Sequence, residues 1–136
     1  MSVNEANRTQ SRLEAAVRAN KLAAYTLHIT ANEKIFLPKY RSALTDKIIS
    51  DAVDIYRYTK RANDIRVTKS EHWQKRNEYQ RAAVEYCNDL IALISLAKPV
   101  FHLTSKRIEY WIGMTIETRE IIKAWNDKDR DRYKGV

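Results

Sequence analysis

Histidine and cysteine are the side chains that could bind a metal or act as a nucleophile, and their spacing argues against both. His28, His72 and His102 lie in three different segments, and none has a second ligand at metal-binding spacing. The patterns Cys-x-x-Cys and His-Glu-x-x-His do not occur. Cys87 lies among apolar residues, which is typical of a small core side chain. The sequence therefore predicts no metal, no cofactor and no catalytic residues, and we do not expect an enzyme.

Basic side chains are the second group that could carry a function, through contacts with phosphate. Between residues 57 and 81 there are eight basic and three acidic residues, which leaves a local charge of +5. Each contact of such a residue with a phosphate strengthens binding because condensed counterions are released. We therefore predict a nucleic-acid-binding patch, with an ordinary solvated surface as the alternative. The predicted contact residues are Arg57, Lys60, Arg61, Arg66, Lys69, Lys75, Arg76 and Arg81.

Two tyrosines accompany this basic window. Tyr58 and Tyr79 lie close enough in the sequence to share its end of the molecule. An aromatic ring can stack on an unpaired base whatever its identity, which suits RNA or single-stranded DNA. The alternative is that both rings pack between two helices.

The charge of the whole chain points the same way. With 25 basic and 17 acidic residues the formal charge is +8, which favours polyanionic partners such as nucleic acid. A single cysteine is typical of a reducing compartment. The amino-terminal residues lack the layout of a signal peptide, and no apolar run is long enough to span a membrane. We expect a cytoplasmic protein without a membrane anchor.

Long helices must position these residues, because only two glycines and two prolines are available for turns. Apolar residues recur at steps of three and four in four segments, at about 11–34, 38–66, 68–98 and 104–126. We predict an all-α fold, an antiparallel up-down-up-down four-helix bundle over residues 11–126. Residues 1–10 are expected to form a flexible extension and residues 127–136 a charged, disordered tail.

Capping patterns and apolar stripes refine these segments. Ser11 with Glu14 and Thr68 with Glu71 are spaced as capping boxes, and Thr104 can cap the last helix. In the first segment we expect the stripe to face the core. Its residues are Leu13, Ala16, Val17, Ala24, Leu27 and Ala31.

The third segment is apolar nearly all round in its later half, which implies burial on more than one side. One interpretation is a subunit interface, and the other is a central helix wrapped by its neighbours. The predicted interface residues are Tyr86, Leu90, Leu93 and Ala97.

The turn between the first two segments resembles that of a known family. It contains Phe36, Pro38 and Lys39, followed by Tyr40 and Arg41, and the stripe from Leu44 to Asn63 continues the likeness. This stretch resembles the accessory variability determinant of diversity-generating retroelements and the related proteins encoded by ribosomal RNA intervening sequences. The resemblance implies a ring-like homopentamer of four-helix bundles. It further implies association with a reverse transcriptase and template RNA, in support of mutagenic cDNA synthesis.

Alternative functions remain open at the level of the sequence. The intervening-sequence branch implies a structural or protein-interaction bundle without a reverse-transcriptase partner. A basic surface of this kind would also bind an acidic protein. A third possibility is an enzyme whose site is assembled between subunits.

Overall fold

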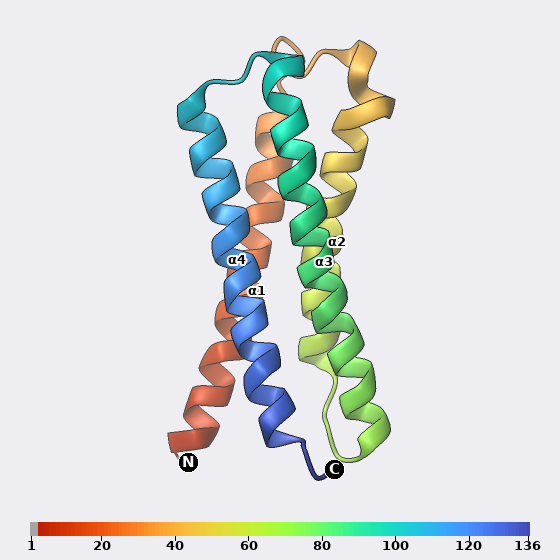
Figure 1. Cartoon of the computed structure of the whole chain (residues 1–136), viewed down its shortest axis with the longest axis vertical. Helices are drawn as coiled ribbons and strands as arrows, with labels where there is room; N and C mark the ends of the chain where they lie inside the picture. Colours follow the sequence, from red (N-terminus) through yellow and green to blue (C-terminus); the bar gives the residue numbers. More distant parts are fainter. Residues whose placement is uncertain (1–2) are drawn as a thin grey trace.

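The structure is a computed structural model that describes residues 3–136, and the burial of side chains is described from residue 11 onward. Within residues 3–136 it is entirely helical and contains no strand, which confirms the predicted all-α four-helix bundle. Successive long helices lie side by side and are joined at alternate ends (Figure 1). The elements are α1 (Val3–Thr30), the 3₁₀ turn η1 (Pro38–Tyr40), the π turn η2 (Arg41–Thr45), α2 (Asp46–Asp64), α3 (Ser70–Phe101) and α4 (Ser105–Arg132).

The core lies along the axis of the bundle, where α1 and α3 each contact both α2 and α4. The stripe predicted for α2 is confirmed, since Ile48, Ala52 and Ile55 are fully buried. They meet Leu90 and Ile94 of α3 in one continuous apolar cluster. Each buried leucine or isoleucine side chain stabilises the fold by about 1.5–3 kcal/mol.

The stripe predicted for α1 faces solvent, so that prediction is wrong. Leu13, Val17 and Leu27 are 57%, 49% and 47% exposed. The opposite side of α1, which carries Leu22 and Thr26, is the buried one. The buried side of α1 also carries Ala15 and Ala19, whose hydrophobic signal is weaker than that of Leu13 and Val17. Thr26 is nevertheless suited to the core, since its hydroxyl accepts a hydrogen bond of 3.0 Å from Trp111 Nε1.

Both ends of the chain are more helical than expected. Residues 3–10, predicted to be a flexible extension, form the first turns of α1, so Ser11 lies inside the helix and does not cap it. Residues 1 and 2 lie outside the described part. At the other end α4 continues to Arg132, through most of the segment predicted to be disordered. The reason is Asp129, which is fully buried and paired, as described below.

The helix boundaries combine confirmed and corrected predictions. Thr104 caps α4, with its hydroxyl accepting the Arg107 N–H at 3.2 Å. Thr68 does not cap α3: its N–H instead donates to His72 Nδ1 at 3.2 Å. Pro99 lies inside α3, which continues to Phe101. The Lys98 carbonyl accepts the N–H groups of the two residues after Phe101 and closes the last turn.

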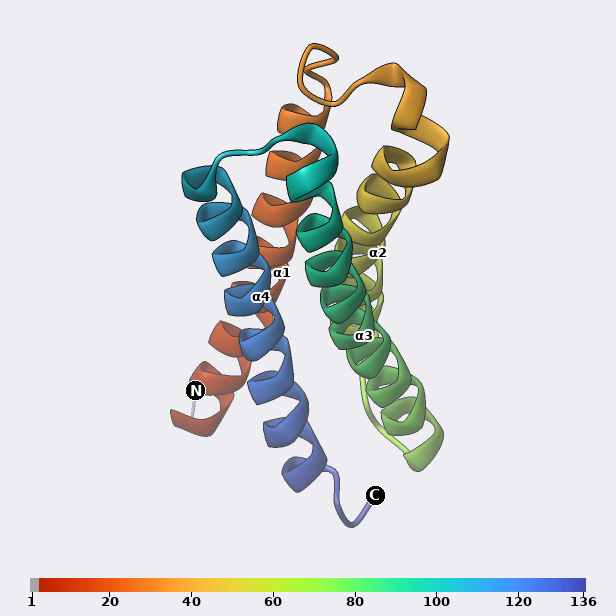
Figure 2. The same cartoon turned by 45° about the horizontal axis from the view of Figure 1, so that its top comes forward.

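The two ends of the bundle differ in what they hold (Figures 1 and 2). One end, here called the termini end, contains the α2–α3 reversal at residues 65–69 together with both chain termini. The other, here called the aromatic end, contains the connections at residues 31–45 and 102–104. Figure 2 shows the longer of these connections rising above the ends of α1 and α2.

Candidate nucleic-acid interface

The predicted basic residues gather at the termini end, around the α2–α3 reversal. Seven of the eight are exposed, on the last turns of α2, the reversal itself and the first turns of α3. A surface of this kind presents its charges to a partner without any change of fold. We call it the reversal patch, and its members are Arg57, Lys60, Arg61, Arg66, Lys69, Lys75 and Arg81.

Most of these cations have a carboxylate neighbour in the same molecule. The pairs are exposed, and an exposed ion pair contributes only about 0–1 kcal/mol. A phosphate can therefore replace the carboxylate at little cost, although each neighbour lowers the local positive potential. The pairs are Arg57 with Asp54 (2.8 Å), Lys60 with Asp64 (3.4 Å), Lys69 with Glu71 (3.6 Å) and Lys75 with Glu78 (3.8 Å).

Arg61 is held by aromatic rings. Its guanidinium lies 5.2 Å from the ring centre of Tyr58 and 6.0 Å from that of Tyr79. The two rings are half-buried, with centres 5.7 Å apart, and Tyr86 stacks on Tyr58 at 5.4 Å. The tyrosines therefore pack between α2 and α3, as in the helix-interface alternative, and only their outer edges are left for a base.

Arg76 is not part of the surface, and its assignment as a phosphate contact is wrong. Its side chain is 2% exposed and lies 5.7 Å from the ring centre of Trp125. The Nε group donates to the Ala62 carbonyl at 3.1 Å, and Nη1 donates to the Tyr133 hydroxyl at 3.2 Å. Nη1 also lies 3.6 Å from the Asp129 carboxylate. A buried, paired guanidinium cannot reach a phosphate.

Asp129 is the centre of a buried polar network below the reversal patch. Its carboxylate accepts from Gln80 Nε2 at 2.9 Å and from Arg132 Nη1 at 2.6 Å. The amide of Asn126 donates to Gln80 Oε1 at 2.6 Å and to Asn77 Oδ1 at 2.9 Å. These directional bonds fasten the last turns of α4 to α3, which explains why residues 127–132 are helical.

The interface predicted on α3 is wrong for two of its four residues. Leu90 and Ala97 have no exposed surface, because both lie in the core of their own bundle. Tyr86 and Leu93 are half-buried against the same core. The core-facing residues of α3 pack against α2 and α4, whereas Leu96 in its later half is 53% exposed. The apolar surplus of α3 is therefore covered only in part.

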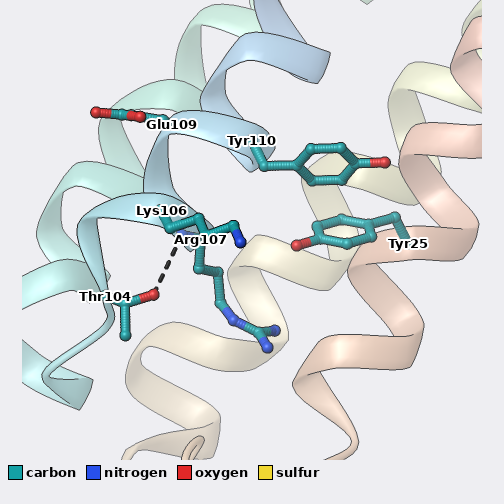
Figure 3. A pocket seen from close by; sticks show the side chains of 6 residues that line it. All are labelled: Tyr25, Thr104, Lys106, Arg107, Glu109 and Tyr110. Carbon is teal, nitrogen blue, oxygen red and sulfur yellow. Dashed lines mark hydrogen bonds between the residues drawn. The ribbon is translucent and has the colours of Figure 1, made fainter.

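A second cationic site lies at the aromatic end and was missed from the sequence. Tyr25 of α1 and Arg107 of α4 border a hollow of about 740 Å³ at the start of α4 (Figure 3). Tyr110 is 57% exposed, and its ring centre lies 5.0 Å from that of Tyr25. The available signal was the pair Lys106-Arg107, two and three residues after the capping residue Thr104. The complete lining is Tyr25, Thr104, Lys106, Arg107, Glu109 and Tyr110.

The electrostatics of this second hollow are mixed. Burial raises the pKa of the Tyr25 hydroxyl, and the positive charge of Arg107 partly opposes that rise. Glu109 adds a carboxylate to the rim, so the hollow carries both signs of charge. It can accept a small anion beside an aromatic ring, but it offers fewer cations than the reversal patch.

Two further groups bear on the chemistry of the bundle. Burial, with Asp89 and Asp54 nearby, raises the pKa of Asp51 to about 6. Burial also raises the pKa of the Cys87 thiol to about 12, so this cysteine is a neutral core side chain at physiological pH. Among the described residues, no three histidine, cysteine or acidic side chains are grouped so that they could hold a metal ion.

The fold and these sites define a helical bundle with a cationic end. No protein-family model, no curated protein and no solved structure matches the chain. The resemblance to retroelement accessory proteins therefore remains a prediction. Over the described residues, none of the helices combines the length and the apolar character that crossing a bilayer requires.

Proposed function

We propose that this protein is a binding subunit, with no chemistry of its own, that associates with RNA or DNA through the reversal patch. The observation that carries the proposal is the gathering of seven exposed cations on two adjoining helix ends. The buried network around Asp129 supports it, because that network holds the helices below the patch in fixed positions. A fixed helical platform leaves only the side chains to be ordered when the patch binds.

The binding mechanism is electrostatic. Lysine and arginine side chains exchange their carboxylate neighbours for phosphate oxygens, and the nucleic acid releases condensed counterions. The slope of log affinity against log salt is about −0.7 for each phosphate contact on a single strand. Arg61 adds a planar, aromatic-backed guanidinium on which a base can stack.

The family resemblance extends this proposal to a second partner. In that reading the subunit brings a reverse transcriptase and its template RNA together and supports mutagenic cDNA synthesis. A ring of five bundles belongs to the same prediction. Because Leu90 and Ala97 are core residues, a ring of this kind needs a different contact surface. A reverse-transcriptase gene beside this one, flanked by near-identical repeats that differ at adenines, would favour this reading.

Binding of the purified protein to labelled RNA tests the proposal. Fluorescence anisotropy at several salt concentrations should give a steep slope for the unchanged protein. The variant Arg57→Ala/Lys60→Ala/Arg61→Ala should bind more weakly, with a slope smaller by about 2 if the strand is single. The control variant Lys34→Ala/Lys47→Ala/Lys123→Ala removes the same charge from exposed positions elsewhere and should change the slope little.

Two results would count against the proposal. If both variants reduce the slope equally, binding depends on net charge and not on the reversal patch. If the protein binds polyglutamate but does not bind RNA, the protein-interaction alternative is favoured. Native mass spectrometry separately tests the ring of five.

A further inference from the structure

The hollow at the start of α4 brings three hydrogen-bond donors to one place. Figure 3 shows the side chains of Lys106 and Arg107 extending to the side of α4 that faces Tyr25 of α1. Burial keeps the pKa of the Tyr25 hydroxyl above its ordinary value of 10.0, and the Arg107 guanidinium is close enough to oppose that rise. The hydroxyl is therefore protonated at physiological pH and can donate. The hollow offers an ammonium, a guanidinium and a phenol to a ligand.

The two cations of the hollow have no carboxylate partner, in contrast to most cations of the reversal patch. Among the side chains of residues 11–136, no ion pair includes Lys106 or Arg107. Of the described residues that line the hollow, Glu109 alone carries a carboxylate, and Figure 3 shows it extending away from Tyr25. An anion can therefore bind between the donors without displacing an internal partner.

An exposed aromatic ring lies directly beside these donors. Tyr110 is 57% exposed, and its ring centre lies 5.0 Å from that of Tyr25. Tyr25 in turn packs edge-on with Trp111 at 6.3 Å, and Trp111 donates to the Thr26 hydroxyl at 3.0 Å. The ring of Tyr110 is thus supported from the core side and open on the solvent side, where a flat ligand can lie against it.

The space around Tyr110 extends beyond the first hollow. A second hollow of about 520 Å³ adjoins it, and the two share Glu109 and Tyr110 in their linings. Gly113 lies in this second hollow, and a Cβ atom added there would meet nothing within 4 Å. A ring held against Tyr110 therefore has room, while a group attached to that ring reaches the donors in the first hollow.

The three donors match the chemistry of a phosphate monoester. Such a group carries about −1.5 to −2 charges at pH 7 and three acceptor oxygens. The planar fork of Arg107 fits two phosphate oxygens, which leaves the third for Lys106 and the Tyr25 hydroxyl. A carboxylate has a single charge and only two oxygens. The volume of about 740 Å³ is that of a site for a small organic molecule, typically about 300–1,000 Å³, and exceeds what an inorganic ion needs.

We infer that the hollow at the start of α4 binds a phosphate monoester carried on an aromatic base, as in a nucleoside monophosphate. The phosphate contacts Lys106, Arg107 and the Tyr25 hydroxyl, and the base lies against Tyr110. The same chemistry occurs in a free nucleotide and at the 5′-phosphorylated end of a nucleic-acid strand. The site lies at the aromatic end, opposite the reversal patch, and does not depend on what the reversal patch binds.

Titration of the ¹⁵N-labelled protein with adenosine 5′-monophosphate, followed by NMR, tests the site. The nucleotide should bind with a Kd below about 1 mM and shift the backbone amides of residues 104–110. Adenosine should cause no shift over the same range, because it lacks the phosphate. Inorganic phosphate should bind at least about fivefold more weakly, because it lacks the base. Equal binding of nucleotide and adenosine, or shifts confined to residues 57–81, would overturn the inference.

Variants of the cations test the phosphate contacts. Arg107→Ala should weaken binding of the nucleotide by at least about tenfold, and Arg107→Lys should fall between the two because it keeps the charge and loses the fork. The matched control is Lys123→Ala, which removes an exposed cation elsewhere on α4 and should leave the affinity unchanged. Unaltered melting temperatures check the fold. Equal losses in Arg107→Ala and Lys123→Ala would show attraction by net charge alone and overturn the inference.

Variants of the tyrosines separate the phosphate from the base. Tyr25→Phe keeps the ring and should weaken the nucleotide and inorganic phosphate alike, by about threefold, since it removes one donor. Tyr110→Ala should weaken the nucleotide by at least about fivefold and leave the affinity for inorganic phosphate unchanged. If Tyr110→Ala leaves the affinity for the nucleotide unchanged, the base does not lie against this ring, and that part of the inference is wrong.

The two sources of the ligand are compared in Arg57→Ala/Lys60→Ala/Arg61→Ala, so that the reversal patch contributes little. The probes are two strands of about six nucleotides, one with a 5′-phosphate and one with a 5′-hydroxyl. Binding of the phosphorylated strand at least about tenfold tighter than the nucleotide assigns the hollow to a strand end. Equal affinities assign it to a free nucleotide. If the unchanged protein binds RNA but not the nucleotide, the proposed function stands and this inference fails.

Discussion

The two ends of the bundle are held together by different physics. At the termini end Arg76 and Asp129 are buried with Gln80 in a network of directional bonds. At the aromatic end Phe36 lies 4.9 Å from the ring centre of Phe101 and 6.1 Å from that of Trp111. The polar network is stable only if each hydrogen-bonding partner is present. The aromatic cluster depends mainly on how well its side chains fill the available volume.

This difference explains what each end can do. A satisfied polar network fixes positions closely, and a fixed platform suits a patch that must present cations to phosphates. Aromatic packing is less directional, and it leaves an open hollow beside Tyr110 at the start of α4. The end with the larger share of buried charge is thus also the end we assign to nucleic acid.

The largest expected effect comes from breaking the network at its centre. Asp129→Ala should lower the free energy of unfolding by about 3–5 kcal/mol, because it leaves the Arg76 guanidinium buried without its carboxylate. Urea denaturation measures the change. The control is Asp127→Ala, which removes an exposed carboxylate paired with Arg130 and should cost less than about 1 kcal/mol. Equal losses in the two variants would show that the buried network is not special.

Removing both charges should cost less than removing one. In Arg76→Met/Asp129→Leu no buried ion is left unpaired, so we expect a smaller loss than in Asp129→Ala, by at least about 1 kcal/mol. The same denaturation curves give the comparison. A double variant that is less stable than Asp129→Ala would mean that the remaining bonds to Ala62 and Tyr133 matter more than the ion pair.

The aromatic end should tolerate an apolar replacement. Phe36→Leu keeps most of the buried volume and should lower the free energy of unfolding by about 1–2 kcal/mol. The loss should be the same at low and high salt, since no charge is involved, and denaturation at the two salt concentrations measures it. A loss as large as that of Asp129→Ala would remove the contrast between the two ends.

Removing the cap of α4 should have a moderate effect at the aromatic end. Thr104→Ala loses the hydrogen bond to the Arg107 N–H and should cost about 1 kcal/mol, whereas Thr104→Ser should keep most of the stability. Thr68→Ala is the control, because the hydroxyl of Thr68 does not cap a helix. Thermal denaturation ranks the three variants, and equal effects of Thr104→Ala and Thr68→Ala would contradict the assigned cap.

The sequence predicted the fold best where a helix has a single apolar face. In α2 the stripe through Ile48, Ala52 and Ile55 faces the core as expected. In α1 two stripes share the helical period, so periodicity could not tell which one faces inward. The larger residues Leu13 and Val17 suggested the wrong one, because alanines that let helices approach closely carry a weak hydrophobic signal.

The candidate site was predictable for exposed charges and not for buried ones. Lysine and arginine are rarely buried, so exposure was the correct expectation for residues such as Lys60 and Arg66. Arg76 departs from it because its partner Asp129 lies far along the chain, in a segment whose alternating charges resemble a solvated tail. Pairing of that kind depends on tertiary structure and leaves no local pattern.

The smallest effect should come from a carboxylate midway between the two ends. The pKa of Asp51 is raised from 3.8 to about 6, first by burial and then by Asp89 and Asp54. In the window between these values the folded protein keeps a proton that the unfolded chain releases, so stability falls as the pH rises and the cost is complete above pH 6. Asp51→Asn should therefore stabilise the bundle above that window and have little effect below it. Because Asp51 is only partly buried, the gain should stay below about 1 kcal/mol.

Urea denaturation on either side of the window measures the effect of Asp51→Asn. Asp131→Asn is the control, since Asp131 is an exposed carboxylate on α4 whose loss should change stability by a similar small amount at both pH values. If the gain in stability of Asp51→Asn does not depend on pH, the cost comes from burying the polar carboxyl group and not from its ionisation. Such a result would mean that charge contributes to stability at the termini end, through Arg76 and Asp129, and not at Asp51.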